Sequence, residues 1–275
     1  MKKYLFFILF IFIIYGCSNK ITNNKRTVTV TIEPLRYFTE QIAGDKIEVQ
    51  TMVAKGGNPE TYEPTAKQMA NLQQSDLYIK VGNIGFERTW MKKLKENAPH
   101  TIFVDSSDGI SYSERQDGAK DPHTWMSTTN AIIIANNIYH ALSEIDNKDS
   151  IYFKQNLKKL ICHIGDVDDK IKKILVNNKN RTFLIYHPAL TYYAKDYKLR
   201  QIAIEEEGRE PSANQLLTTI ALAKSMKVKK TFVLKEFSNR NTLIVSNNVG
   251  SKAITINPFN YEWDKEMVNI AEKLK

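Results

Sequence analysis

Cysteine is almost absent from this 275-residue chain, which contains only Cys17 and Cys162. Two cysteines cannot form the disulfide framework of a small secreted scaffold, so the fold must depend on an ordinary hydrophobic core. The apolar run at residues 4–15 is shorter than the roughly 20 residues of a membrane-spanning helix. The sequence also lacks a compact metallohydrolase motif such as His-Glu-x-x-His. Basic residues give a net charge of +9 but are scattered without interleaved aromatics, so we expect no nucleic-acid partner.

The N-terminus has the pattern of a bacterial lipoprotein leader. Lys2 and Lys3 precede the apolar run, and Ile14-Tyr15-Gly16-Cys17 resembles a lipobox, in which the cysteine receives the lipid. We therefore predict a signal peptide over residues 1–16, a lipid anchor on Cys17 and a flexible polar tether over residues 17–26. The alternative is a plain signal peptide with an incidental cysteine. The mature protein is expected on the periplasmic side of a membrane or on the cell surface, anchored by lipid.

The remainder has ordinary globular composition, with 42% hydrophobic and 25% charged residues, enough for two modest domains. Short β-branched runs alternate with helical patterns, which predicts parallel, doubly wound α/β architecture. We expect an N-terminal lobe over residues 27–148, a single connecting helix over 149–177 and a C-terminal lobe over 178–275. Thr65 and Ser212 are predicted helix caps, as is Thr128 or Thr129. Glu33-Pro34-Leu35 is expected to end the first strand before a helix over residues 37–43.

Three metal-competent side chains stand beside turn-forming prolines. They are Glu60 after Pro59, His123 after Pro122, and His187 before Pro188. Each follows a predicted strand or apolar run, and ligands of doubly wound sheets gather at the carboxyl ends of strands. We predict that the three meet in a cleft between the lobes and bind a divalent transition metal. Taken alone, His123 could equally be a surface histidine in a turn.

The residues do not fix a fourth ligand. Asn257 follows the last predicted strand, although an amide oxygen is a poor ligand for zinc. Glu205 and Glu236 also follow strands of the C-terminal lobe and are alternatives, and a water molecule is another. His163 lies inside the connecting helix, where we interpret it as a surface or packing residue.

The chain from residue 27 to its end resembles the zinc/manganese-type solute-binding proteins of metal ABC importers, the metal-binding receptor lipoproteins. The matching segments are Gly57-Asn58-Pro59-Glu60-Thr61-Tyr62-Glu63-Pro64, Glu87-Arg88-Thr89-Trp90, Asp121-Pro122-His123-Thr124-Trp125, His187-Pro188-Ala189-Leu190 and Glu210-Pro211-Ser212. The resemblance implies two α/β lobes joined by one long helix, with a metal between them. It implies His123 and His187 as ligands. Glu60 stands where the family usually has histidine, and Asn257 stands where it usually has aspartate.

The resemblance also implies the function and the partners. We expect a monomeric lipoprotein that captures Zn²⁺, with Mn²⁺ as the alternative, and delivers it to an ABC permease in the membrane. A histidine-rich acidic loop common in zinc-specific members is missing, since residues 110–120 contain no histidine. Two other functions fit a secreted metal protein: a zinc-dependent hydrolase using Glu60 or Glu236 as general base, and a surface adhesion lipoprotein with a structural metal.

Overall fold

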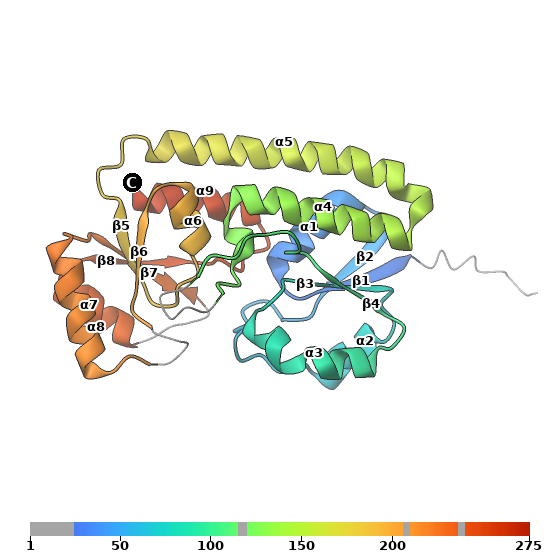
Figure 1. The fold of residues 1–275 in the computed structure, drawn as a ribbon, viewed down its shortest axis with the longest axis horizontal. Helices are drawn as coiled ribbons and strands as arrows, with labels where there is room; N and C mark the ends of the chain where they lie inside the picture. The colour runs from blue at the N-terminus through green and yellow to red at the C-terminus, as the bar shows by residue number, and fades with distance from the viewer. Residues whose placement is uncertain (1–24, 115–119, 206–209, 236–239) are drawn as a thin grey trace, which may run out of the picture.

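A computed structural model describes residues 25–114, 120–205, 210–235 and 240–275 of the chain. These residues form two α/β lobes, each with one four-stranded parallel sheet, and a single long helix passes over both (Figure 1). The predicted fold class is confirmed. The predicted leader, Cys17 and residues 17–24 of the predicted tether lie outside the described residues, and the first strand already begins at Arg26, the last residue of that tether.

The N-terminal lobe has the strand order β2-β1-β3-β4, so the direction of winding changes between β1 and β3. Its strands are β1 Arg26–Val30, β2 Ile47–Thr51, β3 Leu77–Lys80 and β4 Ile102–Asp105. Its helices are α1 Glu33–Ala43, α2 Ala66–Leu72, α3 Gly85–Asn97 and α4 Thr128–Ile145. The carboxyl ends of these strands lead into the loops that carry polar residues, as expected for parallel sheets.

The C-terminal lobe repeats this topology with the order β6-β5-β7-β8. Its strands are β5 Thr182–Ile185, β6 Arg200–Ala203, β7 Lys230–Leu234 and β8 Lys252–Ile256. Its helices are α6 Thr191–Asp196, α7 Ala213–Ser225, α8 Arg240–Val249 and α9 Trp263–Leu274. The winding changes between β5 and β7, which makes the end of β5 the expected place for a ligand-binding residue.

Local signals in the sequence set several helix ends. Thr65 and Ser212 each form the predicted cap, in both cases as a capping box with a glutamine three residues later. The predicted cap of α4 was wrong, because the hydroxyl of Ser127, one residue before Thr128, accepts the Asn130 N–H. The strand before Glu33-Pro34-Leu35 ends as predicted, at Val30, but the following helix begins earlier than the predicted residue 37. Helix α1 begins at Glu33, since proline fits the first helical turn, where its missing N–H needs no partner.

The connecting helix α5, Ser150–Leu175, agrees with the predicted long helix and lies across both lobes (Figure 1). One face of the helix is buried along its whole length and consists of the side chains of Phe153, Leu157, Leu160, Ile164, Val167, Ile171 and Leu175. It packs on α1 and α4 of the N-terminal lobe and on α9 of the C-terminal lobe. The main hydrophobic cluster consequently runs from one lobe into the other.

Direct contacts also join the lobes beneath α5. The Tyr261 hydroxyl donates to Glu40 Oε2 at 2.6 Å, and the Trp263 ring lies 4.9 Å from that of Phe38. Trp125 and Trp263, which lie at the lobe boundary, are both buried. The Trp263 indole N–H donates to the Trp125 carbonyl at 2.7 Å. The lobes are therefore held in one relative position by packed aromatic residues and hydrogen bonds.

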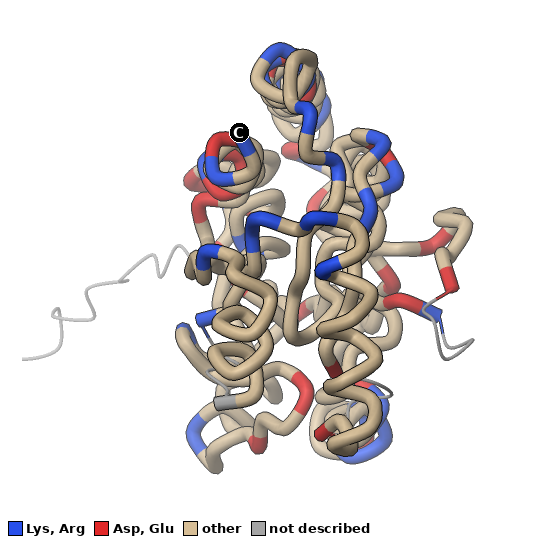
Figure 2. The backbone as a smooth tube through the Cα atoms, turned by 90° about the vertical axis from the view of Figure 1, so that its left-hand side faces the viewer, with Lys and Arg blue, Asp and Glu red and all other residues tan. Residues whose placement is uncertain are grey.

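The surface of the molecule mixes charges of both signs. Lys and Arg positions are spread over both lobes rather than forming one basic band (Figure 2). Within the described part of the chain, no helix combines the length and apolar character needed to cross a bilayer.

Candidate metal centre

Glu60 is placed by the loop between β2 and α2. Its backbone N–H donates to Asn58 Oδ1 at 2.9 Å, and the carbonyl of Pro59 accepts the Phe86 N–H at 2.8 Å. The latter bond ties this loop to the start of α3. There Gly85 lies so close that a Cβ on it would stand 2.3 Å from Glu60 Oε2 and 2.8 Å from Glu60 Cα. A glycine at this position therefore makes room for the Glu60 carboxylate.

His123 lies in the segment between β4 and α4, which is green in Figure 1 and reaches toward the C-terminal lobe. The Tyr192 hydroxyl of α6 donates to the Asp121 carbonyl at 2.7 Å, which holds this segment against that lobe. The Asp121 carboxylate in turn accepts from the His123 backbone N–H at 2.9 Å, and its Oδ1 lies 2.7 Å from His123 Nδ1. Both side chains are fully buried. The imidazole is thus held by a short hydrogen bond to a buried carboxylate.

The charge of Asp121 follows from its surroundings. Burial tends to raise the pKa of this carboxyl, but its interactions with His123, which include hydrogen bonds from Nδ1 and from the backbone N–H, outweigh burial, and the pKa lies below its usual value. Asp121 is therefore ionised at neutral pH. Its second oxygen, Oδ2, is buried without a hydrogen-bond partner among the described residues. An ionised carboxylate at this place makes His123 Nδ1 the protonated nitrogen.

His187 follows β5, at the point where the winding of the C-terminal sheet changes. It is 2% exposed. Its Nδ1 lies 3.2 Å from Glu205 Oε1 and 3.3 Å from Oε2. Glu205 follows the neighbouring strand β6, and β5 and β6 are parallel, so their carboxyl ends bring the two side chains together. His187 therefore has the same arrangement as His123, with a carboxylate at Nδ1.

The two imidazoles meet through their other nitrogens, since His123 Nε2 lies 3.2 Å from His187 Nε2. When Nδ1 carries the proton and donates a hydrogen bond to a carboxylate, Nε2 keeps a lone pair that can bind a metal ion. Two nitrogens bound to one tetrahedral zinc at its normal bond length would be about 3.3 Å apart. The observed separation fits a shared transition metal.

Glu60 completes the group. One carboxylate oxygen of Glu60 and one nitrogen of each imidazole all lie within 4.8 Å of one another, and in the described residues no other set of three His, Cys, Asp or Glu side chains meets this criterion. The structure thus brings together residues from both lobes that are far apart in sequence. Their donors, two imidazoles and a carboxylate, form the ligand set of many zinc sites.

The other predicted ligands have different positions. Glu205 is not part of the three-residue group, because its carboxylate is directed to Nδ1 of His187. Asn257 lies in the loop after β8, and its Oδ1 accepts the Phe259 N–H at 3.1 Å. This loop is beside the site, since the Phe259 ring lies 6.3 Å from that of His123. Glu236 lies outside the described residues.

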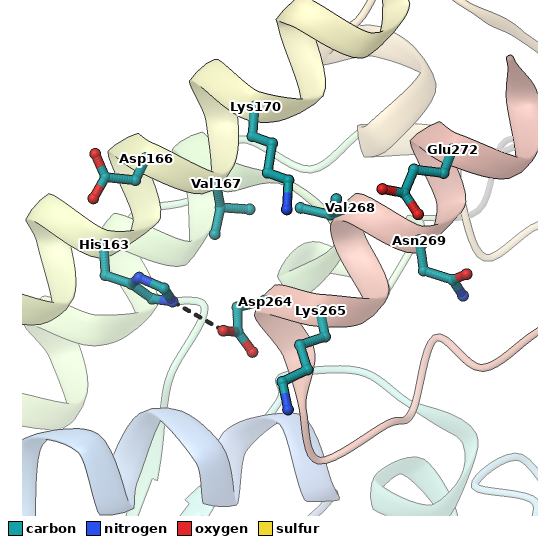
Figure 3. A pocket seen from close by; sticks show the side chains of 9 residues that line it. All are labelled: His163, Asp166, Val167, Lys170, Asp264, Lys265, Val268, Asn269 and Glu272. Atoms are coloured by element: carbon teal, nitrogen blue, oxygen red, sulfur yellow. Dashed lines mark hydrogen bonds and ion pairs between the residues drawn. The ribbon is translucent and has the colours of Figure 1, made fainter.

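A second histidine–carboxylate pair occurs away from this group, between α5 and α9. His163 Nε2 lies 2.9 Å from Asp264 Oδ2 at the edge of a pocket of about 310 Å³ (Figure 3). The remaining side chains around it include acids and bases, among them Asp166 and Lys265. Because no third ligand joins the pair in the described residues, it is a contact between helices, consistent with a surface role for His163.

Sequence reasoning missed three contributors to the site. Asp121 was noted only as part of the Asp-Pro-His segment, although an aspartate two residues before a histidine can accept its backbone N–H. Arg88 contacts Glu60, with Nη2 3.3 Å from Oε2, and Gly85 makes room for it. Arg88 appeared in the sequence only within the matching segment Glu87-Arg88-Thr89-Trp90, and Gly85 gave no signal, because both contacts depend on how the loop after β2 meets α3.

The family model described as "Zinc-uptake complex component A periplasmic" matches residues 28–269. The chain belongs to this family. It is 28% identical over 270 residues to the high-affinity zinc uptake system protein ZnuA of Bacillus subtilis (strain 168), a match covering 89% of this chain and 84% of that protein. It is 29% identical over 245 residues to the manganese ABC transporter substrate-binding lipoprotein PsaA of Streptococcus pneumoniae, covering 84% and 79%.

The fold agrees with a solved member of the family. A crystal structure of ZnuA superposes with a TM-score of 0.87 and 32% sequence identity, covering 91% of this chain and 98% of that one. Family membership identifies the chain as a substrate-binding component of a metal ABC transporter, as the sequence resemblance implied. The alternative of a zinc-dependent hydrolase is thereby excluded, because the relatives are uptake and substrate-binding proteins of ABC transporters and not enzymes.

Proposed function

We propose that this protein captures one Zn²⁺ ion between its lobes, in preference to Mn²⁺, with Glu60, His123 and His187 as ligands. The observation that carries the proposal is the single group of three donor atoms within 4.8 Å, contributed by both lobes. Two of the three donors are imidazoles, which suit zinc, whereas manganese favours carboxylate and carbonyl oxygen. The names of the relatives include both zinc and manganese.

The arrangement of carboxylates behind the histidines supports capture of a dication. Asp121 and Glu205 each accept a hydrogen bond from Nδ1 of one ligand, which orients the ring and makes Nε2 a better donor. Together with Glu60 they place three acidic groups around the ion, which offset its charge. For the fourth coordination position we keep the amide oxygen of Asn257, the carboxylate of Glu236 and water as candidates.

The captured ion is passed to the membrane permease of an ABC importer. The reason is the family itself, whose members are named as components of metal uptake systems. We further propose residues 1–16 as a cleaved leader and Cys17 as the lipid-bearing residue, which would hold the protein at the outer face of the membrane beside its permease. We propose that the protein acts as a monomer. Its N-terminal lobe comprises residues 27–148, its connecting helix residues 149–177 and its C-terminal lobe residues 178–275.

Metal analysis of the purified mature protein, followed by competition titrations with Zn²⁺ and Mn²⁺, tests this proposal. We expect one zinc per chain, a tighter zinc than manganese complex, and release of protons on binding wherever an imidazole is protonated beforehand, because imidazoles must be neutral to coordinate a metal. The double variant His123→Ala/His187→Ala should lose the ion. Retention of one zinc at unchanged affinity in that variant would refute the assignment. Unchanged metal uptake in cells lacking the gene would instead support the adhesion alternative.

A further inference from the structure

The carboxylate of Glu60 has a second neighbour besides the two imidazoles. Arg88, in the first turn of α3, places its guanidinium Nη2 3.3 Å from Glu60 Oε2, while its Nη1 donates to the Asn83 carbonyl at 2.6 Å. The Arg88 side chain is 49% exposed and that of Glu60 is 20% exposed. A permanently charged cation therefore already occupies one side of the carboxylate that would contact the metal.

This contact is not what holds Glu60 in place. The Glu60 backbone is bound by Asn58, and the preceding carbonyl is bound by the Phe86 N–H. A single-contact ion pair with one half-exposed partner adds little to the order of a loop that is already tied at two backbone positions. The principal effect of Arg88 is therefore on the charge of the ligand set rather than on the position of the ligand.

We propose that Arg88 sets the affinity of the site by competing with the bound ion for the Glu60 carboxylate. The inference rests on the proposed function, because it takes Glu60 as a ligand. Hydrogen bonding to the guanidinium draws electron density from the carboxylate, and the positive charge repels a dication held by the same group. The affinity for the ion is therefore lower than the affinity that three acidic groups and two imidazoles would give without Arg88. The ion also dissociates faster. For a protein that must surrender its ion, such a limit on affinity assists release.

Three variants on the same helix test the proposal in the mature protein. Arg88→Gln removes the charge and keeps a similar shape, Arg88→Lys keeps the charge, and Lys92→Gln is the matched control. Lys92 is 89% exposed, lies one turn further along α3 and pairs with Glu96 rather than with Glu60. Zinc affinity is measured against a competing chelating dye, release by mixing with excess chelator, and folding by thermal unfolding without metal.

We expect Arg88→Gln to bind Zn²⁺ about tenfold more tightly, equivalent to about 1.4 kcal/mol, and to release it more slowly. Arg88→Lys should remain within about twofold of the wild type, as should Lys92→Gln. Raising a non-coordinating salt from about 0.1 M to about 1 M should shrink the gain of Arg88→Gln, because the Debye length falls from about 10 Å to about 3 Å. A purely structural role would instead weaken binding, without this dependence on salt.

Equal or weaker zinc binding by Arg88→Gln overturns the inference, as does an equal gain in Lys92→Gln. The His123→Ala/His187→Ala protein separates this failure from failure of the proposed function. If that double variant loses zinc while Arg88→Gln shows no gain, only the role of Arg88 is wrong. If the double variant keeps zinc at full affinity, the ligand assignment fails and the inference fails with it.

Discussion

The carboxylates behind the two histidines provide a sharp test of how the site works. Asp121→Asn and Glu205→Gln each remove one negative charge but keep an oxygen that can accept a hydrogen bond from the histidine Nδ1–H. Loss of such a partner typically lowers metal affinity 10- to 100-fold, or about 1.4–2.7 kcal/mol. The structure allows the two losses to be ranked within this range.

Asp121 should have the larger effect. Its Oδ1 lies 2.7 Å from His123 Nδ1, and both partners are fully buried, whereas the Glu205 contacts with His187 are 3.2 Å and 3.3 Å long. Short, charge-assisted hydrogen bonds are the stronger ones. We therefore expect a loss of about 100-fold in zinc affinity for Asp121→Asn and of about tenfold for Glu205→Gln.

Zinc-induced thermal stabilisation provides the assay, with titration against a chelating dye as an independent measure. A hundredfold weaker Kd removes about 2.7 kcal/mol of stabilisation at saturating zinc. For a chain of this size the zinc-induced rise in Tm should shrink by roughly 5–10 °C in Asp121→Asn. Comparing each variant with and without zinc removes any effect of the substitution on the metal-free fold.

Asp264→Asn is the matched control. It also removes a carboxylate bonded to a histidine, at 2.9 Å from His163, but between α5 and α9 and outside the three-residue group. Its zinc affinity should equal that of the wild type. The reasoning would be refuted if Asp121→Asn retained wild-type affinity, or if Glu205→Gln lost clearly more than Asp121→Asn.

Three further predictions follow from the structure. Gly85→Ala should keep α3, for which alanine is the better helix former, yet weaken zinc binding by about tenfold because the new Cβ displaces Glu60; unchanged affinity in a dye titration would contradict this. Burial raises the pKa of Glu87 despite three hydrogen bonds that lower it, so folding favours the protonated form. The free energy of unfolding relative to Glu87→Gln should be highest below about pH 4.3 and should fall as the pH rises through the higher folded pKa. If urea unfolding gave the same pH dependence for both proteins, the effect would be excluded. Tyr261→Phe removes the bond to Glu40 between the lobes and should cost about 1 kcal/mol, seen as a Tm lower by roughly 2–4 °C, with zinc affinity unchanged.

The sequence by itself determined the architecture of this protein. Alternation of β-branched runs with amphipathic segments predicted the parallel lobes, and more than seven turns of helical spacing predicted α5 within one or two residues of its ends. Strand-end placement also selected Glu60, His123 and His187, because parallel strands deliver their carboxyl ends to one edge. These signals are local or periodic, so they survive without knowledge of contacts.

Only the tertiary structure decided which groups those side chains contact. It places Glu205, a predicted candidate ligand, at Nδ1 of His187, and it places Asp121 at Nδ1 of His123. It also placed Arg88 against Glu60. The physical reason is that hydrogen bonds and ion pairs depend on distances of a few tenths of an ångström between groups far apart in the chain. The spacing of residues along the sequence predicts the order of the helices and strands. It does not predict which nitrogen of the His123 or His187 imidazole a carboxylate contacts.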